Sequence, residues 1–287
     1  MGHGARSGPH VPVLTGGPYA SRMSGRESRK VSGYRERNST ADRALDILGM
    51  FSDQVPVVSA AQVAAHLGVA RSTGYRYIQT LVANRYLEEA PSGGFRLGLR
   101  LLELARLARR TYGLSEIAMP VLTALADTVH ETVLLTRRVG DLVVCLDRAE
   151  SQTHAVRISY ERGSTLPVNA GASALVLLAW TDPAEARALL AGSRLQRFTA
   201  STLTDVDALM TRLAQIRADG FSITRSELDH DVLGVAAPIR DGEGRVVAAV
   251  SVAAVASRVS QQGENEIRLQ VSRAADAISE RLATVDG

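Results

Sequence analysis

The pattern of apolar and polar positions predicts a first helix that begins near residue 40. Ser39 or Thr40 can cap its start, because a side-chain oxygen there accepts a hydrogen bond from a free backbone N–H of the first turn. Apolar side chains then recur at helical spacing, at Ala44, Leu45, Leu48 and Phe51. Pro56 interrupts this run, since proline does not continue a helix.

Two further helices follow after short connections. Ser59 can cap the second helix, residues 60–67, and Gly68 ends it. A third helix runs from about residue 70 to residue 84. Its inward-facing side chains are expected at Ile78, Leu81 and Val82. A helix, a short turn with glycine and a second helix form the order of a helix-turn-helix motif.

The sequence after the third helix predicts a β-hairpin and then a long helix. Two short strands, residues 86–89 and 95–97, flank a Pro-Ser-Gly-Gly turn, and a hairpin at this place is a wing. We therefore expect a winged helix-turn-helix domain over residues 39–98. Residues 99–113 carry leucines on one broad face, which predicts a linker helix. That face can pack on a second copy of the chain or on its own domain.

Residues 114–287 combine strands with helices, and we expect an α+β domain with an antiparallel sheet. Residues 131–149 and 232–255 each contain two apolar runs around a glycine-containing turn, which indicates two hairpins. Residues 154–160 indicate a further strand. Helices are predicted at residues 171–180, 183–191, 205–219 and 262–283.

The charge of the chain separates a basic front from an acidic remainder. Residues 1–40 carry seven basic and two acidic side chains, and residues 41–112 carry nine arginines and six acids, yet the net charge of the whole chain is only +3. This asymmetry favours a polyanionic partner for the front of the chain. Residues 1–38 lack an apolar period and are predicted to be a disordered basic leader. The leader is either an inert tail that includes a mis-assigned start, or an arm that touches DNA phosphates.

Composition limits the class of protein further. An apolar content of 45% with 22% charged residues is typical of a soluble globular protein, and the longest apolar runs are too short for a membrane helix. Cys145 is the only cysteine, so neither an internal disulfide nor a cysteine-based zinc site is expected. Together with the lack of a signal peptide, these features predict a cytoplasmic protein with no membrane partner.

The third helix has a polar, basic face that suits DNA. A recognition helix presents its first residues to the major groove, where arginine pairs with guanine and hydroxyls bond to bases or phosphates. The free N–H groups at its start also favour a phosphate. The expected DNA contacts are Ser59, Arg71, Ser72, Thr73, Tyr75 and Arg76 in the helices and Arg96 in the wing. The alternative is a winged helix used for protein contacts, with its arginines merely solvated.

Several segments resemble the IclR (isocitrate lyase regulator) family of bacterial transcription factors. They are "ADRALDILGMF", "AAQVAAHLGVARSTGYRYIQTLVANRYLE", "FRLG" and "ADGFSITRSELDHDVLGVAAPIRDGEGRVVAAVSV", and the resemblance covers residues 39–285. It implies an N-terminal winged helix-turn-helix that binds operator DNA. It also implies that residues 114–287 form a GAF-like domain that binds a small effector and forms dimers or tetramers. The partners so implied are double-stranded operator DNA, a small organic effector and further copies of the chain.

Two positions of the third helix depart from the family pattern. The family usually has a bulky apolar residue at the position of Gly74 and a leucine at that of Tyr77. Glycine lowers the helix propensity by about 1 kcal/mol relative to alanine. We expect the larger Tyr77 to fill the space that Gly74 leaves. The operator sequence cannot be transferred from relatives on this basis.

The start of the predicted helix 171–180 is the candidate effector site. Free backbone N–H groups at Gly171, Ala172 and Ser173 can hold a carboxylate or another oxygen. The alternative is a helix buried for packing, with Ser173 as its cap. The resemblance adds the pocket residues Thr224, Gly234, Ser251 and Ala253. Family members that sense small carboxylates tend to have an acid, a cysteine and two serines at these positions, whereas this chain keeps only Ser251. Gly234 has no side chain and Ala253 has no hydroxyl. We therefore expect a roomier, more apolar pocket for an effector larger or more aromatic than pyruvate or glyoxylate.

Motifs for catalysis or for a cofactor are missing. The nucleophile elbow Gly-x-Ser-x-Gly is incomplete in "GASAL", and no phosphate loop, dinucleotide fingerprint or His-Glu-x-x-His occurs. The segment "ELDHD" at 227–231 is interpreted as a loop, because metal sites need ligands from several segments. Cys145 is expected in the core, with a pocket-lining or redox role as alternatives.

We therefore expect a ligand-responsive transcriptional regulator, a repressor or an activator, with no cofactor, no metal site and no catalytic residue. An effector-independent DNA-binding protein and an enzyme of the C-terminal domain are the alternatives.

Overall fold

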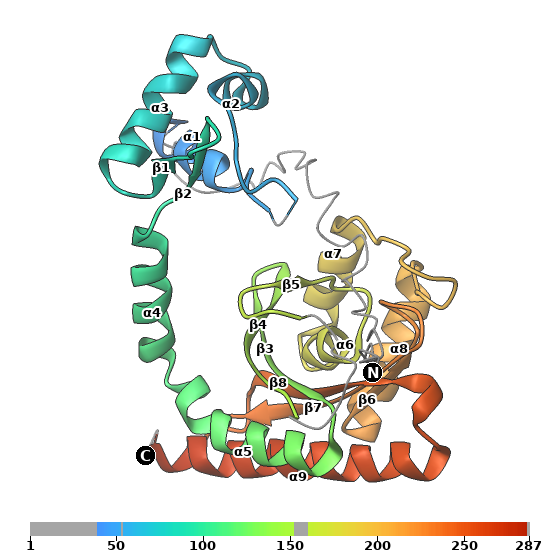
Figure 1. The fold of residues 1–287 in the computed structure, drawn as a ribbon. Coiled ribbons are helices and arrows are strands. Elements are labelled where there is room, and N and C mark those ends of the chain that lie inside the picture. The colour runs from blue at the N-terminus through green and yellow to red at the C-terminus, as the bar shows by residue number, and fades with distance from the viewer. Residues whose placement is uncertain (1–38, 53, 152–159, 286–287) are drawn as a thin grey trace, which may run out of the picture. The chain divides into compact units, whose positions relative to one another are not determined.

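The computed structural model describes residues 39–52, 54–151 and 160–285 of the chain (Figure 1). They divide into two compact units, an N-terminal unit up to Tyr112 and a C-terminal unit from Gly113. The predicted leader, residues 1–38, and nearly all of the predicted strand 154–160 lie outside the described residues.

The N-terminal unit contains the three predicted helices and the wing. Its elements are α1 (Ser39–Leu48), α2 (Ala60–Leu67), α3 (Arg71–Ala83), β1 (Leu87–Glu89), β2 (Phe95–Leu97) and α4 (Arg100–Tyr112). Strands β1 and β2 pair antiparallel, as expected for a wing. Ile78 and Leu81 of α3 are buried in the core of this unit, and Val82 packs against it.

Both ends of α2 follow the local sequence signals. The Ser59 hydroxyl accepts a hydrogen bond from the backbone N–H of Gln62 (3.2 Å), and the Gln62 side chain accepts one from the Ser59 N–H (2.8 Å). This reciprocal pair is a capping box. Gly68 ends α2 in the left-handed conformation (φ 62°), which glycine adopts at little steric cost. The predicted cap and stop of this helix are confirmed.

The buried face of α1 is rotated from the predicted one. Leu45 is 66% exposed, whereas Ile47 is fully buried. Ala44, Leu48 and Phe51 pack against the core as expected. The four apolar residues Ala44, Leu45, Ile47 and Leu48 cover most of one turn, so the spacing alone did not determine which of them faces the core.

The C-terminal unit is built on a six-stranded sheet in which every neighbouring pair is antiparallel, in the order β5-β4-β3-β8-β7-β6. The strands are β3 (Thr132–Val139), β4 (Leu142–Ala149), β5 (Thr165–Leu166), β6 (Ser222–Arg225), β7 (Val232–Arg240) and β8 (Val246–Val255). The helices are α5 (Leu114–Val129), α6 (Ala172–Ala179), α7 (Pro183–Gly192), α8 (Val206–Asp219) and α9 (Gln261–Val285), and the 3-10 turn η2 (Ala256–Arg258) precedes α9. Sequence patterns predicted neither α5 nor the short strands β5 and β6.

Helices cover both faces of this sheet. Figure 1 shows α5 and α9 side by side along one face, with α6 on the other. Alternate strand residues face opposite layers, so Val250 and Val252 of β8 pack with α5 and α9, whereas Ala249 packs with α6. Helix α6 is buried along its whole length, because it lies between the sheet and α8.

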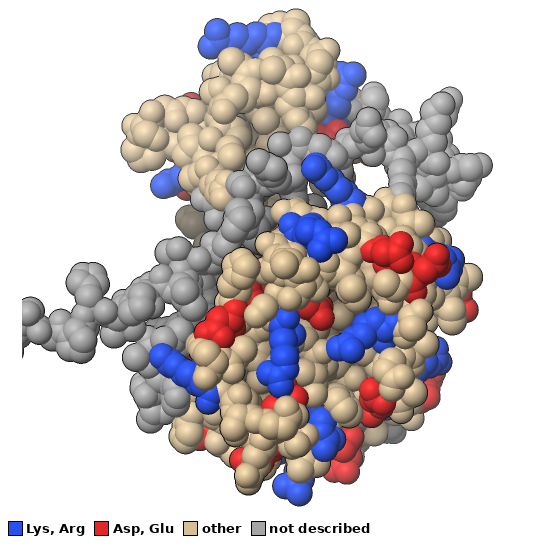
Figure 2. All heavy atoms as spheres, turned by 90° about the vertical axis from the view of Figure 1, so that its right-hand side faces the viewer, with Lys and Arg blue, Asp and Glu red and all other residues tan. Residues whose placement is uncertain are grey.

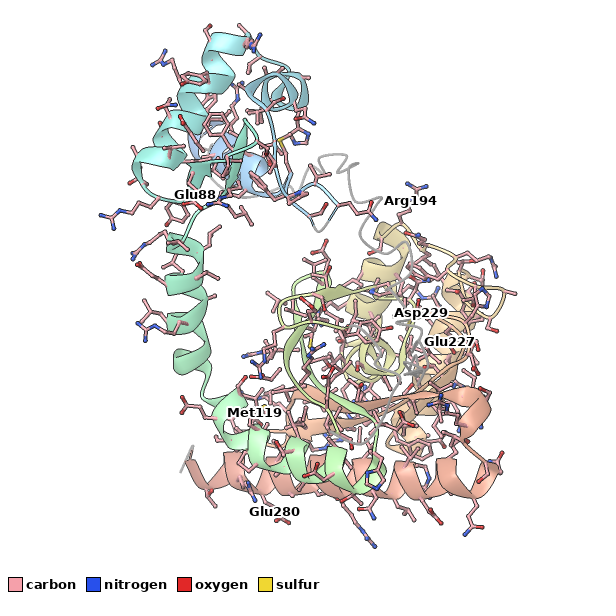
Figure 3. All side chains as sticks on the ribbon, in the orientation of Figure 1. Glu88, Met119, Arg194, Glu227, Asp229 and Glu280 are labelled. Atoms are coloured by element: carbon pink, nitrogen blue, oxygen red, sulfur yellow. The ribbon has the colours of Figure 1, made fainter. Side chains whose placement is uncertain are left out.

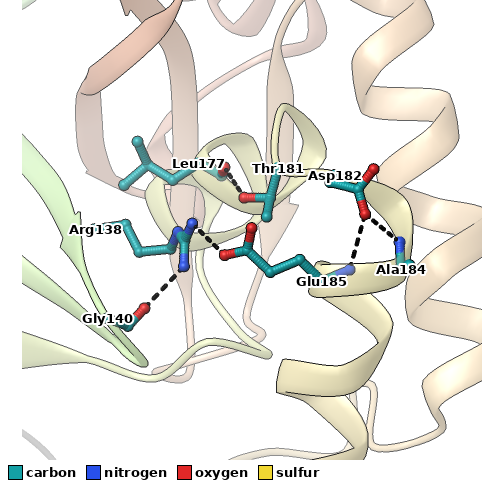
Figure 4. A network of polar contacts seen from close by, with 7 residues as sticks. All are labelled: Arg138, Gly140, Leu177, Thr181, Asp182, Ala184 and Glu185. Carbon is teal, nitrogen blue, oxygen red and sulfur yellow. Dashed lines mark hydrogen bonds and ion pairs between the residues drawn. The ribbon is translucent and has the colours of Figure 1, made fainter. Parts of the chain in front are cut away.

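A polar network joins the β3–β4 turn to the start of α7 (Figure 4). The Arg138 guanidinium donates to the Gly140 carbonyl (2.9 Å) and pairs with Glu185 (2.8 Å). Asp182 caps α7 by accepting from the backbone N–H groups of Ala184 and Glu185. A carboxylate in the first turn of a helix also interacts favourably with the helix dipole. The network therefore holds the β3–β4 turn against α7.

No helix among the described residues is both long and apolar enough to cross a membrane.

Candidate nucleic-acid interface and ligand cavity

Helix α3 has one face in the core and one in solvent. Gly74, Ile78 and Leu81 are buried. The opposite face carries the exposed side chains of Arg71, Ser72, Tyr75 and Arg76, with Thr73 half-buried beside them. No side chain caps the start of α3, and the start of a helix favours an anion. The helix thus presents hydroxyls, two arginines and an uncapped N-terminus on one surface.

Gly74 lies where α3 crosses α2. A Cβ atom at this position would stand 3.2 Å from the Cα and 3.3 Å from the Cβ of Ala64, so the two helices leave little room for a side chain. Tyr77 does not fill this space, contrary to our expectation. Its hydroxyl accepts a hydrogen bond from Arg43 of α1 (3.1 Å), and the Arg43 guanidinium lies 5.8 Å from its ring centre.

Three of the predicted DNA contacts already interact with other groups of the protein. The Ser59 hydroxyl belongs to the capping box of α2. In the wing, the Arg96 Nε lies 2.8 Å from a Glu88 oxygen, and both side chains are partly exposed. The ring of Tyr75 packs edge-on against Phe95, with 6.3 Å between ring centres. Tyr75 therefore links α3 to the wing.

The seven residues predicted for the effector site line a single cavity of the C-terminal unit. This cavity has a volume of about 450 Å³, part of it open to solvent. Its predicted lining residues are Gly171, Ala172, Ser173, Thr224, Gly234, Ser251 and Ala253. Most other lining side chains are apolar, from Leu134, Leu166, Ala170, Ala174, Leu228, Val232 and Val252.

Strand register explains why residues so far apart in the sequence meet here. Thr224 of β6 pairs with Gly234 of β7, which pairs with Ala253 of β8. Directly paired residues point to the same face of a sheet, here the face that α6 covers. Ser251 lies on the same face two residues earlier, and its hydroxyl accepts a hydrogen bond from Ser173 of α6 (2.7 Å).

We expected the missing side chain of Gly234 to enlarge the cavity, but it does not. A Cβ at Gly234 would lie 2.7 Å from the Thr224 Oγ1 and 3.2 Å from the Ala172 Cβ. The Thr224 hydroxyl and the Ala172 methyl group thus occupy the place of a side chain. Glycine here lets α6 approach the sheet closely.

Glu227 and Tyr160 also line the cavity, and the sequence patterns had not selected either. Burial raises the pKa of Glu227 to about 7, although the nearby Arg212 guanidinium and the Gly171 N–H favour its charged form. Its Oε2 is buried and has no hydrogen-bond partner among the described residues. The Tyr160 hydroxyl donates to the neighbouring Asp229 (3.0 Å). Figure 3 labels Glu227 and Asp229 in the loop between β6 and β7.

Hydroxyl groups hold the loop that carries Glu227. Thr199 donates to the Ser226 carbonyl, and Thr202 donates to the Glu227 carbonyl (2.6 Å). At the far end of the loop, the Asp231 carboxylate accepts from the N–H (2.7 Å) and the hydroxyl of Ser257. The loop backbone is thereby fixed at both ends beside the cavity.

Comparison with known proteins identifies the family. Residues 40–91 match the family model for the IclR helix-turn-helix domain, and residues 108–280 match that for the C-terminal domain of the bacterial transcriptional regulator IclR. The chain belongs to the IclR family. The predicted fold class, α+β with an N-terminal winged helix-turn-helix and a C-terminal antiparallel-sheet domain, is confirmed.

Named relatives of this IclR-family chain are transcriptional regulators. The HTH-type regulator XynR of Escherichia coli is 33% identical over 85% of this chain and 96% of its own length. BhcR of Paracoccus denitrificans is 32% identical over 84% of this chain and 86% of its own. An IclR homolog from Microbacterium hydrocarbonoxydans, crystallised with 4-hydroxybenzoate, is 26% identical, with a TM-score of 0.73 over 85% of this chain and 99% of that one.

Cys145 is buried and does not line the cavity. Burial and the Asp147 carboxylate raise the pKa of its thiol to about 11, which makes it unreactive. Within the described part of the chain, no three His, Cys, Asp or Glu side chains gather as a metal site would require.

The surface of the C-terminal unit has mixed charge. On the face that Figure 2 shows, arginines and acidic side chains are interspersed over a mostly uncharged surface. This face therefore carries no extended basic surface of the kind that follows a nucleic-acid backbone.

Proposed function

We propose that this IclR-family regulator binds operator DNA in the cytoplasm as a homo-oligomer and responds to a small organic effector bound in its C-terminal cavity. The cavity carries the proposal. It joins hydroxyl groups, a carboxyl and the start of α6 to an apolar wall, and ligand sites in proteins typically combine such groups. Such a regulator acts as a repressor or as an activator.

The exposed face of α3 supports the DNA-binding part. Arg71, Ser72, Tyr75 and Arg76 are exposed, at the end of the helix that enters the major groove in such motifs. Thr73 and the wing residue Arg96 extend the proposed surface. The Ser59 hydroxyl serves α2 as a cap, so we propose that Ser59 contacts DNA through the start of that helix.

The cavity residues support an effector with an apolar body. The described lining is mainly aliphatic and contains the hydroxyls of Ser173, Ser251 and Thr224. The homolog from Microbacterium hydrocarbonoxydans was crystallised with an aromatic acid. We propose an effector larger or more apolar than a two- or three-carbon keto acid.

Helix α4 supports self-association. Leu99 just before it is 66% exposed, and Leu102 within it is 68% exposed. Exposed leucines three positions apart lie on one side of a helix, and a second copy of the same helix can cover them. A dimer that pairs two recognition helices matches the two half-sites of a palindromic operator. Dimer and tetramer both meet this requirement.

A gel-shift experiment with DNA from upstream of the gene, with and without 4-hydroxybenzoate, tests the proposal. Retardation at low salt is expected, because phosphate contacts alone give measurable binding there. Its absence would refute the DNA-binding part. Retardation that no candidate metabolite alters would instead favour the alternative, an effector-independent DNA-binding protein. Thermal stabilisation by two- or three-carbon acids only would refute the proposed effector size.

An enzymatic C-terminal domain is the other alternative. The named relatives are regulators rather than enzymes, and the Ser173 hydroxyl in the cavity donates to another hydroxyl, that of Ser251, rather than to a base that would activate it for hydrolysis. Catalytic turnover of any ligand that changes the gel shift would support the enzymatic alternative.

A further inference from the structure

The cavity contains a carboxyl group that the described residues satisfy only in part. Glu227 lines the cavity, and its Oε2 is buried without a hydrogen-bond partner among the described residues. A buried polar atom without a partner destabilises the fold, because it has lost its hydrogen bonds to water. A buried polar atom left in this state calls for an explanation, and a bound ligand supplies one.

The surroundings of Glu227 fix its backbone and leave its carboxyl adjustable. Thr202 holds the Glu227 carbonyl, so the residue cannot move away from the cavity without breaking this bond. The terminal torsion of a glutamate side chain is soft. A small rotation therefore turns Oε2 toward a ligand without moving the loop.

Charged and polar groups around Glu227 determine which ligand groups can bind beside its carboxyl. Arg212 of α8 and the Gly171 N–H of α6 favour the carboxylate form, and burial opposes it. On the same loop, Asp229 pairs with the Tyr160 hydroxyl. A ligand anion placed beside Glu227 would face a like charge, or would require the carboxyl to take up a proton. A ligand N–H or O–H faces neither penalty.

We propose that Glu227 selects the effector by accepting a hydrogen bond from it, so that the cavity prefers a neutral or cationic donor-bearing molecule over the corresponding carboxylate. The apolar wall then holds the body of the ligand. The inference rests on the proposed effector site and adds its specificity-determining residue.

Three probes of similar size test the proposal: benzylamine, benzamide and benzoate. Calorimetric titration of the full chain at pH 8 is expected to show that the two donors bind at least tenfold more tightly than benzoate. In Glu227→Gln, which keeps the size of the side chain and removes its charge, the preference for benzylamine over benzoate should fall about tenfold, or about 1.4 kcal/mol. Glu243→Gln, in the exposed β7–β8 turn, is the matched control and should retain the preference.

The pH dependence gives a second readout. A donor binds the carboxylate better than the carboxylic acid, so benzamide affinity should rise as the pH increases through about 7, the pKa of Glu227. This slope should disappear in Glu227→Gln. Benzamide affinity that falls with pH, equal binding of benzoate at pH 8, unchanged preference in Glu227→Gln, or no binding of any probe would each overturn the proposal.

The gel shift separates this inference from the function on which it rests. Normal retardation without donor preference refutes only the role of Glu227. Donor preference without DNA retardation refutes the regulator function and leaves the ligand chemistry of the cavity standing.

Discussion

A single hydrogen atom at Gly74 sets how closely α2 and α3 approach. The Ala64 backbone lies where a side chain at Gly74 would start, and the backbone of a packed helix yields little. The low helix propensity of glycine is therefore offset by a close helix contact. A bulky side chain at this position of the chain would require α3 to lie farther from α2.

Gly74→Leu should lower the free energy of unfolding by roughly 1–3 kcal/mol, as overpacking of a close contact does, measured by urea denaturation. Thr80→Leu is the matched control, because residue 80 is exposed on the same helix and should change stability little. Ala64→Gly should recover part of the loss in the double variant. Equal stability of Gly74→Leu and wild type would contradict the close contact.

Arg76→Ala should weaken operator binding by about 1–3 kcal/mol if this side chain pairs with a base, with the fold intact by circular dichroism. Arg76 is exposed and its neighbour Gly74 is buried, so the guanidinium points away from the core. Arg217→Ala, on an exposed position of the C-terminal unit, should leave the affinity unchanged. Equal affinity of Arg76→Ala and wild type would make Arg76 a solvated surface residue.

At the scale of elements, the wing carries an ion pair on the surface that we propose for DNA. Glu88 and Arg96 are directly paired across β1 and β2, and Figure 3 labels Glu88 at this position. An exposed ion pair of this kind adds only about 0–1 kcal/mol of stability. Its larger effect is to neutralise an arginine that could otherwise contact a phosphate.

Glu88→Gln should therefore strengthen DNA binding at low salt. One added phosphate contact steepens the slope of log affinity against log salt by about 0.9, which a gel-shift series over salt concentration measures. Arg96→Ala should not steepen it. A slope that stays the same in Glu88→Gln would show that Arg96 does not reach the DNA.

Glu131, which lies just before β3, is a second acid whose pKa is shifted by burial. Burial raises the pKa of Glu131 from 4.5 to about 7, and the Arg258 charge only partly opposes this. The folded chain then holds this proton more tightly than the unfolded chain, so the free energy of unfolding falls as the pH rises from about 4.5 to about 7. Glu131→Gln should melt above wild type at pH 8, with the difference shrinking toward pH 5. Glu116→Gln, at an exposed position of α5, should show no such trend, and a trend shared by both variants would count against burial as the cause.

Local sequence signals predicted the elements that have a strong apolar pattern or a clear cap. They failed for elements whose formation depends on tertiary contacts. The capping box at Ser59 and the inward face of α3 are local features, and both were predictable. Helix α5 was missed because it contains Pro120, which in a sequence usually marks the end of a helix. The strand β6 has only four residues, too short for a clear alternation.

The cavity of the C-terminal unit shows the same difference between local patterns and tertiary contacts. Family resemblance, rather than periodicity, brought Thr224, Gly234 and Ser251 together, and strand register shows the physical reason. Glu227 was not selected because its position depends on a loop that Thr199 and Thr202 hold from another part of the chain. No pattern within the segment "ELDHD" reveals that contact.

At the scale of the whole molecule, self-association should depend on the exposed leucines of α4. Leu102→Glu should reduce the mass measured by light scattering and weaken binding to a two-half-site operator more than to a single half-site, since two linked contacts bind more tightly than one. Leu269→Glu is the matched control, because Leu269 is an exposed leucine of α9. An unchanged mass of Leu102→Glu would remove α4 from the interface.

The central pairing of the large sheet joins the beginning of the C-terminal unit to its end. Thr136 of β3 donates to the carbonyl of Ala249 in β8, 113 residues later, and α5 packs on α9. Contacts so distant in sequence form late, whereas the helices and wing of the N-terminal unit contact close neighbours in the chain. During synthesis the DNA-binding unit can therefore fold on the ribosome, while the C-terminal unit must wait until β8 and α9 have emerged. A chain that stops before β8 would still carry a recognition helix but would lack the finished cavity, and a premature stop codon there should yield a fragment that no effector controls.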